Sequence, residues 1–306
     1  MSSYVIGGVF ARTSRAVSLG LVAGVYLVAG GAGALTWWLL APHHHPLTVA
    51  LWADLVGTVV VFAASVVARN ASLYDPYWSV APPLIVLGWV IAAGHGVGVR
   101  QALVLGLVTV WAVRLTGNWA AGWTGLSHED WRYVQIRGQT AGRPPWWLVN
   151  LTGVQLMPTL VVFAGLVAVW PAITGDRPLG WLDAVAAGLT AAAIALEALA
   201  DRQLHRFTGE PANRGRIADR GVWRYVRHPN YLGEIAFWWG LWLFGLAAAP
   251  RWWTVVGPLV MVALFTGVSI PMMDRRSLDR RPGYREHMRK VPALLPRLTR
   301  RPAPAP

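Results

Sequence analysis

The most regular feature of the chain is the alternation of long apolar runs with short, basic polar segments. Most of the runs approach the roughly 20 residues that an α-helix needs to cross a hydrocarbon core of about 30 Å. Their apolar residues are continuous and do not alternate with polar ones, which indicates helices and excludes barrel strands. The sequence therefore predicts an all-α, polytopic transmembrane bundle of about eight spans, at residues 17–41, 48–68, 79–93, 101–121, 150–170, 179–200, 232–249 and 252–271. The runs 79–93 and 232–249 are short enough to be tilted, broken or re-entrant.

Composition supports the same class. Of 306 residues, 55% are hydrophobic and only 13% are charged, which is too few to cover the surface of a soluble globule. We expect a multi-pass integral membrane protein, of a bacterial inner membrane, whose first run is too long for a signal peptide and is retained. The chain has no cysteine, which excludes disulfides and thiolate chemistry. The histidines His43–His45 lie in a short link without nearby carboxylates, so a solvated turn is expected there and no metal site.

The net charge of +13 is unevenly distributed along the chain. Of the 27 Lys and Arg residues, 23 lie in the alternate polar segments 1–16, 69–78, 122–148, 201–230 and 272–306, and three, Arg100, Arg177 and Arg251, lie in the segments between them. This asymmetry is the positive-inside pattern, and it predicts that both termini are cytoplasmic. The charge is then explained by topology and membrane lipids, without nucleic acid. Polar chemistry is expected on the cytoplasmic face, where the loops 122–148 and 201–230 and the tail 272–306 lie.

The densest polar motif runs from Gly221 to Glu234 and reads G-V-W-R-Y-V-R-H-P-N-Y-L-G-E. On a helix that begins at Pro229, Asn230 and Glu234 are four residues apart and share one face. A helix N-terminus with adjacent arginines suits phosphate or carboxylate groups. The simpler alternative is a set of interfacial anchors, with Trp and Tyr in the aromatic belt, but this explains neither Asn230 nor Glu234.

The R-H-P-N-Y-L-G-E motif at 227–234 resembles the cofactor-binding signature of the membrane-bound steroid 5α-reductase family, in particular its bacterial branch. The segment E-A-L-A-D-R-Q-L-H-R-F at 197–207 is similar to a helix end of that family, with Asp201 at the position of an acidic cofactor contact. Three further segments resemble blocks of the bacterial branch: N-A-S-L-Y-D-P-Y-W-S at 70–79, R-L-T-G-N-W at 114–119 and H-E-D-W-R-Y at 128–133. The resemblance covers about residues 69–298. We therefore separate N-terminal spans, residues 1–68, from a reductase-like domain, residues 69–306, in which seven spans are family-like and the first span of the chain is an addition.

This resemblance implies NADPH-dependent reduction of a carbon–carbon double bond conjugated to a carbonyl in a lipophilic substrate, steroid-like or another lipid. Such a reaction needs a hydrogen-bond or proton donor at the carbonyl oxygen, in a dry pocket. By the resemblance, Asp75 is the catalytic carboxyl. Trp111 stands where the family has its tyrosine, so Tyr77 is the expected proton donor and Tyr74 the alternative. A different role for Asp75 is to cap the third span ahead of Pro76.

The same resemblance gives the expected NADPH-binding residues. Arg114 lies within an apolar run and needs a partner, either a cofactor phosphate or Asp75. The basic segment 274–284 binds either the 2′-phosphate of NADPH or lipid head groups. No Rossmann glycine fingerprint is present, so the cofactor is expected between spans. The full expected set is Arg114, Asn118, Arg132, Asp201, Arg206, Arg216, Tyr225, Arg227, His228, Asn230, Tyr231, Glu234, Arg276 and Tyr284.

Two other functions remain open at the level of sequence. The R-H-P-x-Y-x-G core also resembles the isoprenylcysteine carboxyl methyltransferases and phospholipid methyltransferases, which bind S-adenosylmethionine. Asn230, Asp201 and the Y-D-P-Y-W block at 74–78 favour reduction. A non-enzymatic lipid-binding protein would bind no nucleotide tightly. In each case the expected partners are a lipophilic small molecule and membrane lipids, and no protein partner is inferred.

Overall fold

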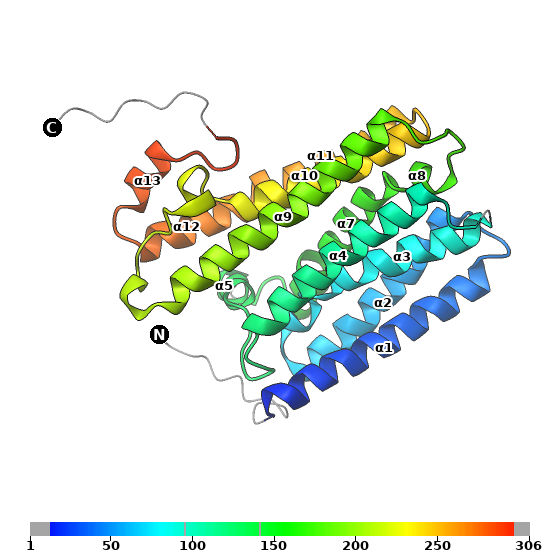
Figure 1. Ribbon diagram of the computed structural model, residues 1–306. Coiled ribbons are helices and arrows are strands. Elements are labelled where there is room, and N and C mark those ends of the chain that lie inside the picture. The colour runs from blue at the N-terminus through cyan, green and yellow to red at the C-terminus, as the bar shows by residue number, and fades with distance from the viewer. Residues whose placement is uncertain (1–12, 95, 141, 297–306) are drawn as a thin grey trace.

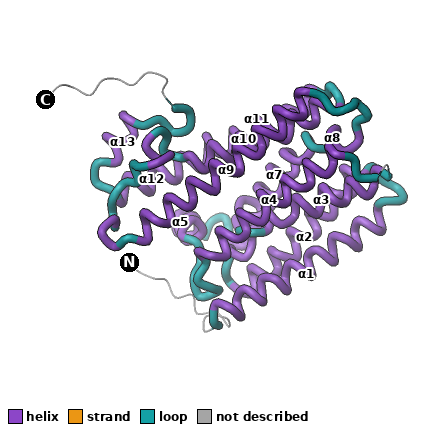
Figure 2. The backbone as a smooth tube through the Cα atoms, viewed as in Figure 1, coloured by secondary structure: helices purple, strands orange, loops and turns teal. Residues whose placement is uncertain are grey.

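The computed structural model describes residues 13–94, 96–140 and 142–296, which form helices and turns and no β-strand (Figures 1 and 2). Eight helical segments within them are long and apolar enough to cross a membrane, which confirms the predicted all-α class and the number of spans. They are Arg15–Leu40, Pro46–Ala68, Ala71–Ala93, Val99–Gly122, Trp146–Thr174, Trp181–Gly209, Pro229–Ala248 and Trp252–Arg280.

Six of the spans contain one continuous α-helix that occupies most or all of their length, and the fifth and eighth are assembled from several pieces. The continuous helices are α1 (Arg15–Leu40), α2 (Pro46–Ala68), α3 (Tyr77–Ala93, after the 3-10 turn η1, Ala71–Tyr74), α4 (Val99–Gly122), α9 (Trp181–Gly209) and α10 (Pro229–Ala248). The fifth span joins α6 (Trp146–Val149), the π-helical η2 (Asn150–Leu156), α7 (Met157–Val167) and α8 (Trp170–Thr174). The eighth joins η5 (Trp252–Val255), α11 (Val256–Leu264), the π-helical η6 (Phe265–Ser269) and α12 (Ile270–Arg280). Between or after spans lie α5 (Trp131–Thr140), η3 (Pro211–Asn213), η4 (Gly221–Arg224) and α13 (Tyr284–Lys290).

The irregular spans are not the ones that their length predicted. The helix α3 is continuous through Pro82 and Pro83, and α10 is regular over 20 residues. The π-helical turns instead precede Pro158 and Pro271, each the second residue of the α-helix that follows. A proline lacks its N–H and its ring crowds the carbonyl four residues earlier, so the backbone just before it widens to keep its other hydrogen bonds.

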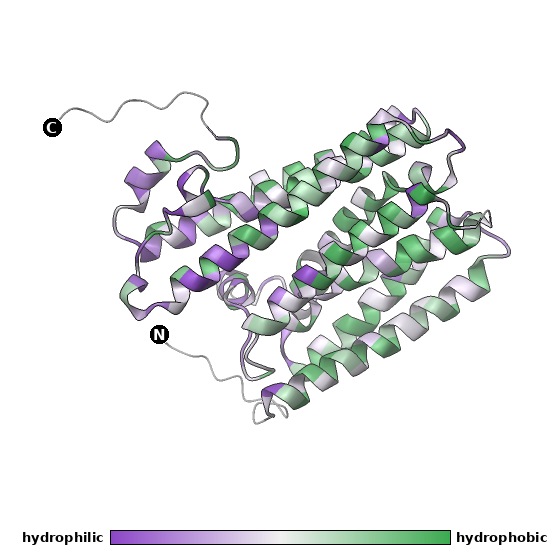
Figure 3. Cartoon of the chain, in the orientation of Figure 1, coloured by the Kyte–Doolittle hydropathy of each residue, from purple (hydrophilic) through white to green (hydrophobic). Residues whose placement is uncertain are grey.

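Both described ends of the chain lie at the same end of the bundle, because the number of spans is even (Figure 1). We call this the basic end; it carries residues 69–78, 122–148, 201–230 and 272–296. Hydrophilic residues concentrate there, whereas the spans are mostly hydrophobic (Figure 3). Short links such as 41–45 and 175–180 form the opposite end.

The core lies among α3, α4, α7, α9 and α10, where Trp89, Trp111, Trp238, Phe237 and Phe244 are completely buried. The helices α9 and α10 approach most closely, and the glycines of α10 make this possible. A Cβ on Gly233 would lie 2.9 Å from the carbonyl oxygen of Ala193, and a Cβ on Gly240 would lie 3.1 Å from the backbone nitrogen of Thr190. Helix α1 packs mainly on α2 and stands at the edge of the bundle (Figure 1).

At the end opposite the basic end, a buried ion pair joins α4 to α9. The Arg100 Nε and Nη2 atoms donate to the two Asp183 oxygens at 2.6 and 2.9 Å, and Asp183 also accepts from the Gly180 N–H at 2.9 Å. The guanidinium further donates to the carbonyls of Arg177 and Pro178. This single pair therefore holds the start of both helices.

We expect Arg100→Met to lower the stability of the protein in detergent by about 3–5 kcal/mol, because it leaves the buried Asp183 carboxylate without its partner. Thermal unfolding measures the effect. Arg251→Met is the matched control, since Arg251 is exposed at the same end of the bundle. Equal melting temperatures for the two variants would contradict a structural role for the pair.

The charge distribution predicts that the basic end is cytoplasmic. A reporter that is active only outside the cytoplasm should give no signal when it is fused after Pro306. The same reporter inserted in the link 175–180 should be active, because that link lies at the other end of the bundle. The reverse pattern would overturn the predicted orientation.

Candidate active site

Asp75 lies between η1 and α3 and binds two side chains of α5. Its Oδ1 atom accepts a hydrogen bond from the Tyr133 hydroxyl and another, of 3.1 Å, from Arg132 Nη2. The Asp75 side chain is 11% exposed. The residue before α3 is Pro76, and no side chain caps that helix, so the alternative in which Asp75 is a helix cap is wrong. Asp75 is instead the acceptor of a buried hydrogen-bonded pair.

The loops that carry Asp75 and α5 are locked together by hydrogen bonds next to this pair. The Asn70 amide donates to the carbonyls of Leu126 and His128 at 3.0 Å each. In the other direction, the Asp130 N–H donates to the Ser72 hydroxyl at 2.8 Å. The polar residues of the N-A-S-L-Y-D and H-E-D-W-R-Y segments thus pack the two segments on each other, and this contact brings Tyr133 to Asp75.

The ionisation of the α5 groups is set by burial and by their neighbours. Burial, and then the Asp75 carboxylate, raise the pKa of Tyr133 well above its ordinary value. Burial opposes ionisation of Asp130, but the Arg132 guanidinium outweighs it and lowers the pKa of that carboxyl. At neutral pH, the Tyr133 hydroxyl therefore stays protonated and donates a hydrogen bond to Asp75. The Arg132 Nε atom donates to Asp130 Oδ1 at 2.8 Å.

The structure does not bring Tyr77, or its alternative Tyr74, to Asp75. The Tyr77 hydroxyl donates to the Asp54 carbonyl and carboxylate at 3.0 Å each, on the far side of α3. The Tyr74 hydroxyl lies 2.7 Å from the Thr159 hydroxyl. The tyrosine that meets Asp75 is Tyr133, which the sequence reasoning did not single out although it belongs to the H-E-D-W-R-Y segment.

A cavity of about 320 Å³ lies between the start of α3, the end of α4 and α5. Its polar wall contains Asp75, Asn118 and Arg132, and its other wall is aromatic, with Trp78, Trp119, Trp123 and Trp131. A cavity with convergent polar groups on one wall and aromatic rings on the other is typical of a small-molecule site. We call it the Asp75 cavity.

Arg114 lies beside this cavity and pairs with acids of α9. Its guanidinium binds the Glu197 carboxylate and, at 2.8 Å, Asp201 Oδ2, and the Asn118 amide donates to the same Asp201 oxygen at 3.3 Å. Arg114 thus has two carboxylates as partners, and the expectation that Asp75 is its partner is wrong. Asp201 is likewise held by the protein itself.

Glu234 is buried between two indoles. Trp111 Nε1 and Trp238 Nε1 each donate to one of its oxygens at 3.0 Å. The Glu197 side chain of α9 packs against Gly233, the residue before Glu234, so the two acids lie on the same α9–α10 contact. Trp111, which stands where the resemblance implied a tyrosine, therefore positions the glutamate of the R-H-P-N-Y-L-G-E motif.

The arginine and histidine of that motif meet another acid, Asp274. Asp274 accepts hydrogen bonds from Arg227 Nη2 at 2.7 Å, from the Tyr284 hydroxyl at 2.6 Å and from His228 Nε2 at 2.9 Å. Burial and the bond to Asp274 raise the pKa of Tyr284 to about 12. The backbone N–H groups of Arg227 and His228 donate to the carbonyls of Pro292 and Ala293. These side chains, expected to bind the cofactor, hold the C-terminal segment on the start of α10.

The other expected cofactor residues form few or no side-chain hydrogen bonds with the described part of the protein. The α10 helix begins at Pro229, as predicted, and the half-buried Asn230 makes no side-chain hydrogen bond within the described part of the chain. Tyr231 stacks on His228, with ring centroids 5.4 Å apart. The Arg276 guanidinium lies 3.6 Å from the ring centroid of Trp131, and its buried Nη1 has no partner among the described residues. Three further residues are exposed at the basic end: Arg206, Arg216 and Tyr225.

Several important side chains were missed by sequence reasoning, which named neither Tyr133, Glu197, Trp238 nor Asp274 as site residues. One signal was available: Glu197 is an acid in an apolar run and lies four residues before Asp201, on the same helix face. The histidine link has a structural role, since His45 Nδ1 accepts the Leu47 N–H at 3.2 Å at the start of α2.

Comparison with known proteins identifies a family. A family model described as "Protein of unknown function (DUF1295)" matches residues 61–291. An uncharacterized protein of Schizosaccharomyces pombe is 27% identical over 279 residues, which cover 83% of this chain and 80% of the relative. No solved structure matches. The family match includes the acids Asp75, Glu197, Asp201, Glu234 and Asp274 and leaves out α1 and the first part of α2. The chain belongs to the DUF1295 family.

Proposed function

We propose that this protein is an NADPH-dependent reductase of a carbon–carbon double bond conjugated to a carbonyl in a lipophilic substrate. The observation that carries the proposal is the hydrogen bond between Tyr133 and Asp75 on the wall of the Asp75 cavity. A carboxyl held in this way, opposite aromatic walls, suits the protonation step of such a reduction.

The two bonds to Asp75 leave one oxygen available to a ligand. Tyr133 and Arg132 both donate to Oδ1, and Oδ2 accepts no hydrogen bond from the described residues. When hydride adds to the β carbon, negative charge develops on the carbonyl oxygen of the substrate. A protonated Asp75 Oδ2 would donate to that oxygen, while Tyr133 and Arg132 fix the orientation of the carboxyl. Trp78, Trp119 and Trp123 would exclude water from the reacting atoms.

NADPH would supply the hydride, and the residues present fit its anionic groups. The unpartnered Nη1 of Arg276 is a buried cationic donor beside Trp131, a residue of the cavity wall. Arg206 and Arg216 are exposed at the same end and suit phosphate groups. Arg114 and Arg227 are each paired with carboxylates, so we assign them the positioning of α9, α10 and the C-terminal segment.

Two alternative functions serve as outcomes of the test. Methyl transfer from S-adenosylmethionine needs a nucleophile and a base, and gives no role to a proton donor at Asp75. A lipid-binding protein without catalysis needs no unpaired arginine in its interior. The proton donor and the unpaired arginine together favour reduction.

We expect the purified protein to bind NADPH, and we expect Arg276→Gln to weaken this binding roughly tenfold to a hundredfold, the effect of losing one hydrogen bond to a charged group. Calorimetric or fluorescence titration measures the affinity. Arg275→Gln is the matched control, because Arg275 is the exposed neighbour on the same helix. Tighter binding of S-adenosylmethionine than of NADPH would favour the methyltransferase, and binding of neither would favour the lipid-binding protein.

We expect Asp75→Asn to oxidise NADPH more slowly than the wild type in the presence of an enone lipid, with unchanged NADPH affinity, because the transferable proton is lost. Asp75→Ala should fall further, by roughly 10²–10³ in rate, since the donor itself is removed. Tyr133→Phe should slow turnover, whereas Tyr77→Phe should not, because Tyr77 binds Asp54 on the other side of α3. Thermal unfolding of the same variants controls for stability. Turnover of Asp75→Asn at the wild-type rate would remove Asp75 from the mechanism.

A further inference from the structure

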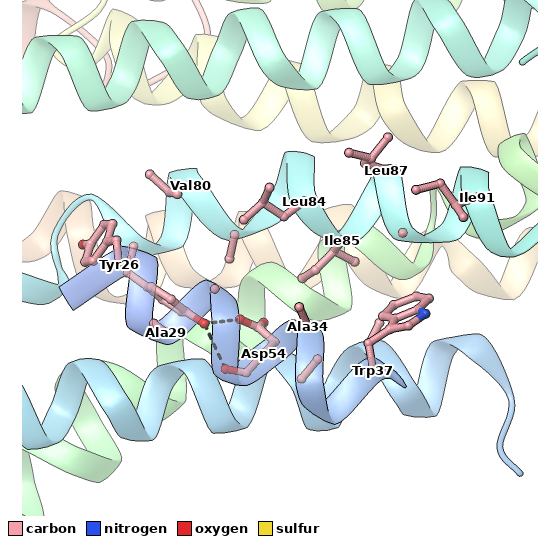
Figure 4. Close-up of a pocket in the computed structure, with 17 residues that line it drawn as sticks. Tyr26, Ala29, Ala34, Trp37, Asp54, Val80, Leu84, Ile85, Leu87 and Ile91 are labelled. Carbon is pink, nitrogen blue, oxygen red and sulfur yellow. Dashed lines mark hydrogen bonds between the residues drawn. The ribbon is translucent and has the colours of Figure 1, made fainter. Parts of the chain in front are cut away.

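A second cavity lies between α1, α2 and α3, apart from the Asp75 cavity (Figure 4). It has a volume of about 390 Å³ and is lined by 17 residues, none of which lines the Asp75 cavity. Between Tyr26 and Trp37, the α1 wall consists of small residues, among them Ala29, Gly30 and Ala34. The space is large enough for a small lipophilic molecule. We call it the Asp54 cavity, after its one charged lining residue.

Aromatic side chains close both ends of the Asp54 cavity. Towards the basic end, the rings of Tyr26 and Tyr77 meet edge to face with centroids 5.8 Å apart, and the Tyr26 hydroxyl donates to the Leu73 carbonyl at 2.7 Å. Towards the other end, the Trp37 ring lies against Gly88, where a Cβ would be 3.1 Å from it. From Tyr26 to Trp37 the helix α1 rises about 16 Å. The cavity is therefore elongated along the bundle.

The cavity opens towards the lipid beside α3. Leu84 and Ile91 line it and are 55% and 71% exposed, which places them on the outer surface of the bundle. The remaining wall of α2 is apolar, with residues such as Ala50. The remaining wall of α3 is also apolar, with residues such as Ile85 (Figure 4). A ligand therefore reaches this cavity from the hydrocarbon of the membrane.

One buried acid interrupts the apolar lining. Asp54 is 6% exposed, and its Oδ1 accepts the Tyr77 hydroxyl at 3.0 Å (Figure 4). Its Oδ2 accepts no hydrogen bond from the described residues. An acid in the middle of a span is costly unless its oxygens are satisfied, so the free oxygen calls for a donor on a ligand.

The depth of Asp54 selects the kind of donor. Asp54 follows the first residue of α2, Pro46, by eight residues, about 12 Å along the helix axis. A phospholipid head group at the membrane surface does not reach that depth. A single hydroxyl on an otherwise apolar body does, because only one polar group has to leave water.

We propose that the Asp54 cavity binds a lipophilic alcohol, whose hydroxyl donates to Asp54 Oδ2 and whose hydrocarbon body lies between Tyr26 and Trp37. This site is independent of the proposed reductase reaction, since the two cavities share no lining residue. One of its walls, α1, also lies outside the DUF1295 match.

The experiment is photolabelling of the full chain in detergent with diazirine- and alkyne-bearing lipids. One arm uses a linear fatty alcohol and the other a polycyclic, sterol-type alcohol, each beside its own methyl ether. We expect at least one alcohol to label residues of α1, α2 and α3, and its ether to label them about five- to tenfold more weakly, because the ether cannot donate. The arm that labels shows which hydrocarbon body fits.

Variants test the same site from the side of the protein. Asp54→Leu should reduce labelling by the alcohol to the level of the ether, while Asp54→Asn, which keeps an acceptor oxygen, should remain within about threefold of the wild type. Gly30→Leu should abolish labelling, because Gly30 lines the cavity and a Cβ there meets no atom within 4 Å. Gly31→Leu is the matched control, since the exposed Gly31 also has no neighbour within 4 Å and lies outside the lining.

Size-exclusion chromatography and thermal unfolding test whether each variant is folded. If Asp54→Leu is unstable, the comparison of photolabelling between Gly30→Leu and Gly31→Leu still tests the proposed site. Equal labelling by alcohol and ether, or equal loss in the two glycine variants, would overturn the proposal. Neither outcome depends on NADPH, so failure here is distinguishable from failure of the reductase proposal.

Discussion

The arrangement of this bundle depends on the high cost of an unpaired charge among membrane helices. Two arginines of α4 meet acids of α9: Arg100 binds Asp183, and Arg114 binds Glu197 and Asp201. Arg100 and Arg114 are 14 residues apart, and so are Asp183 and Glu197. Equal spacing means that both pairs form at once only when the two helices run parallel and in one register, over about 21 Å. A shift by one turn would break the Arg100–Asp183 pair and leave two buried charges without partners, at a cost of several kcal/mol.

The other polar contacts build outward from this frame. Glu197 packs against Gly233 of α10, and the indoles of Trp111 and Trp238 donate to the two oxygens of the neighbouring Glu234. At the basic end, Asp274 holds the start of α10 and the C-terminal segment together. Most of the acids and arginines of the R-H-P-N-Y-L-G-E and E-A-L-A-D segments are thus used to fix helices. Asp75 Oδ2, Arg276 Nη1 and Asp54 Oδ2 form no hydrogen bond with the described residues, and a ligand can form new bonds with them.

This distinction explains how far the sequence could predict the structure. Hydropathy and run length were sufficient for the eight spans, because a bilayer selects for both. The start of α10 at Pro229 followed from local rules for proline. The hydrogen-bond partners of the site residues did not follow from the sequence. Asp75 and Tyr77 are neighbours in the sequence, but Asp75 lies before the first turn of α3, and side chains two apart around a helix point to different sides. Tyr133 reaches Asp75 only through the packing of two loops, which no local pattern encodes.

Helix α3 separates the two cavities, and α1 closes the one that contains Asp54. Asp75, Trp78 and Ser79 face the Asp75 cavity, whereas Tyr77, Val80 and Ala81 face the Asp54 cavity. Without α1, the second face of α3 and the Asp54 carboxyl would lie directly against lipid, where an acid is strongly disfavoured. The small residues of α1 cover that acid without filling the space in front of it. Helix α1 therefore encloses the Asp54 carboxyl of α2, and an enclosed acid with a free oxygen suits a ligand that donates a hydrogen bond to it.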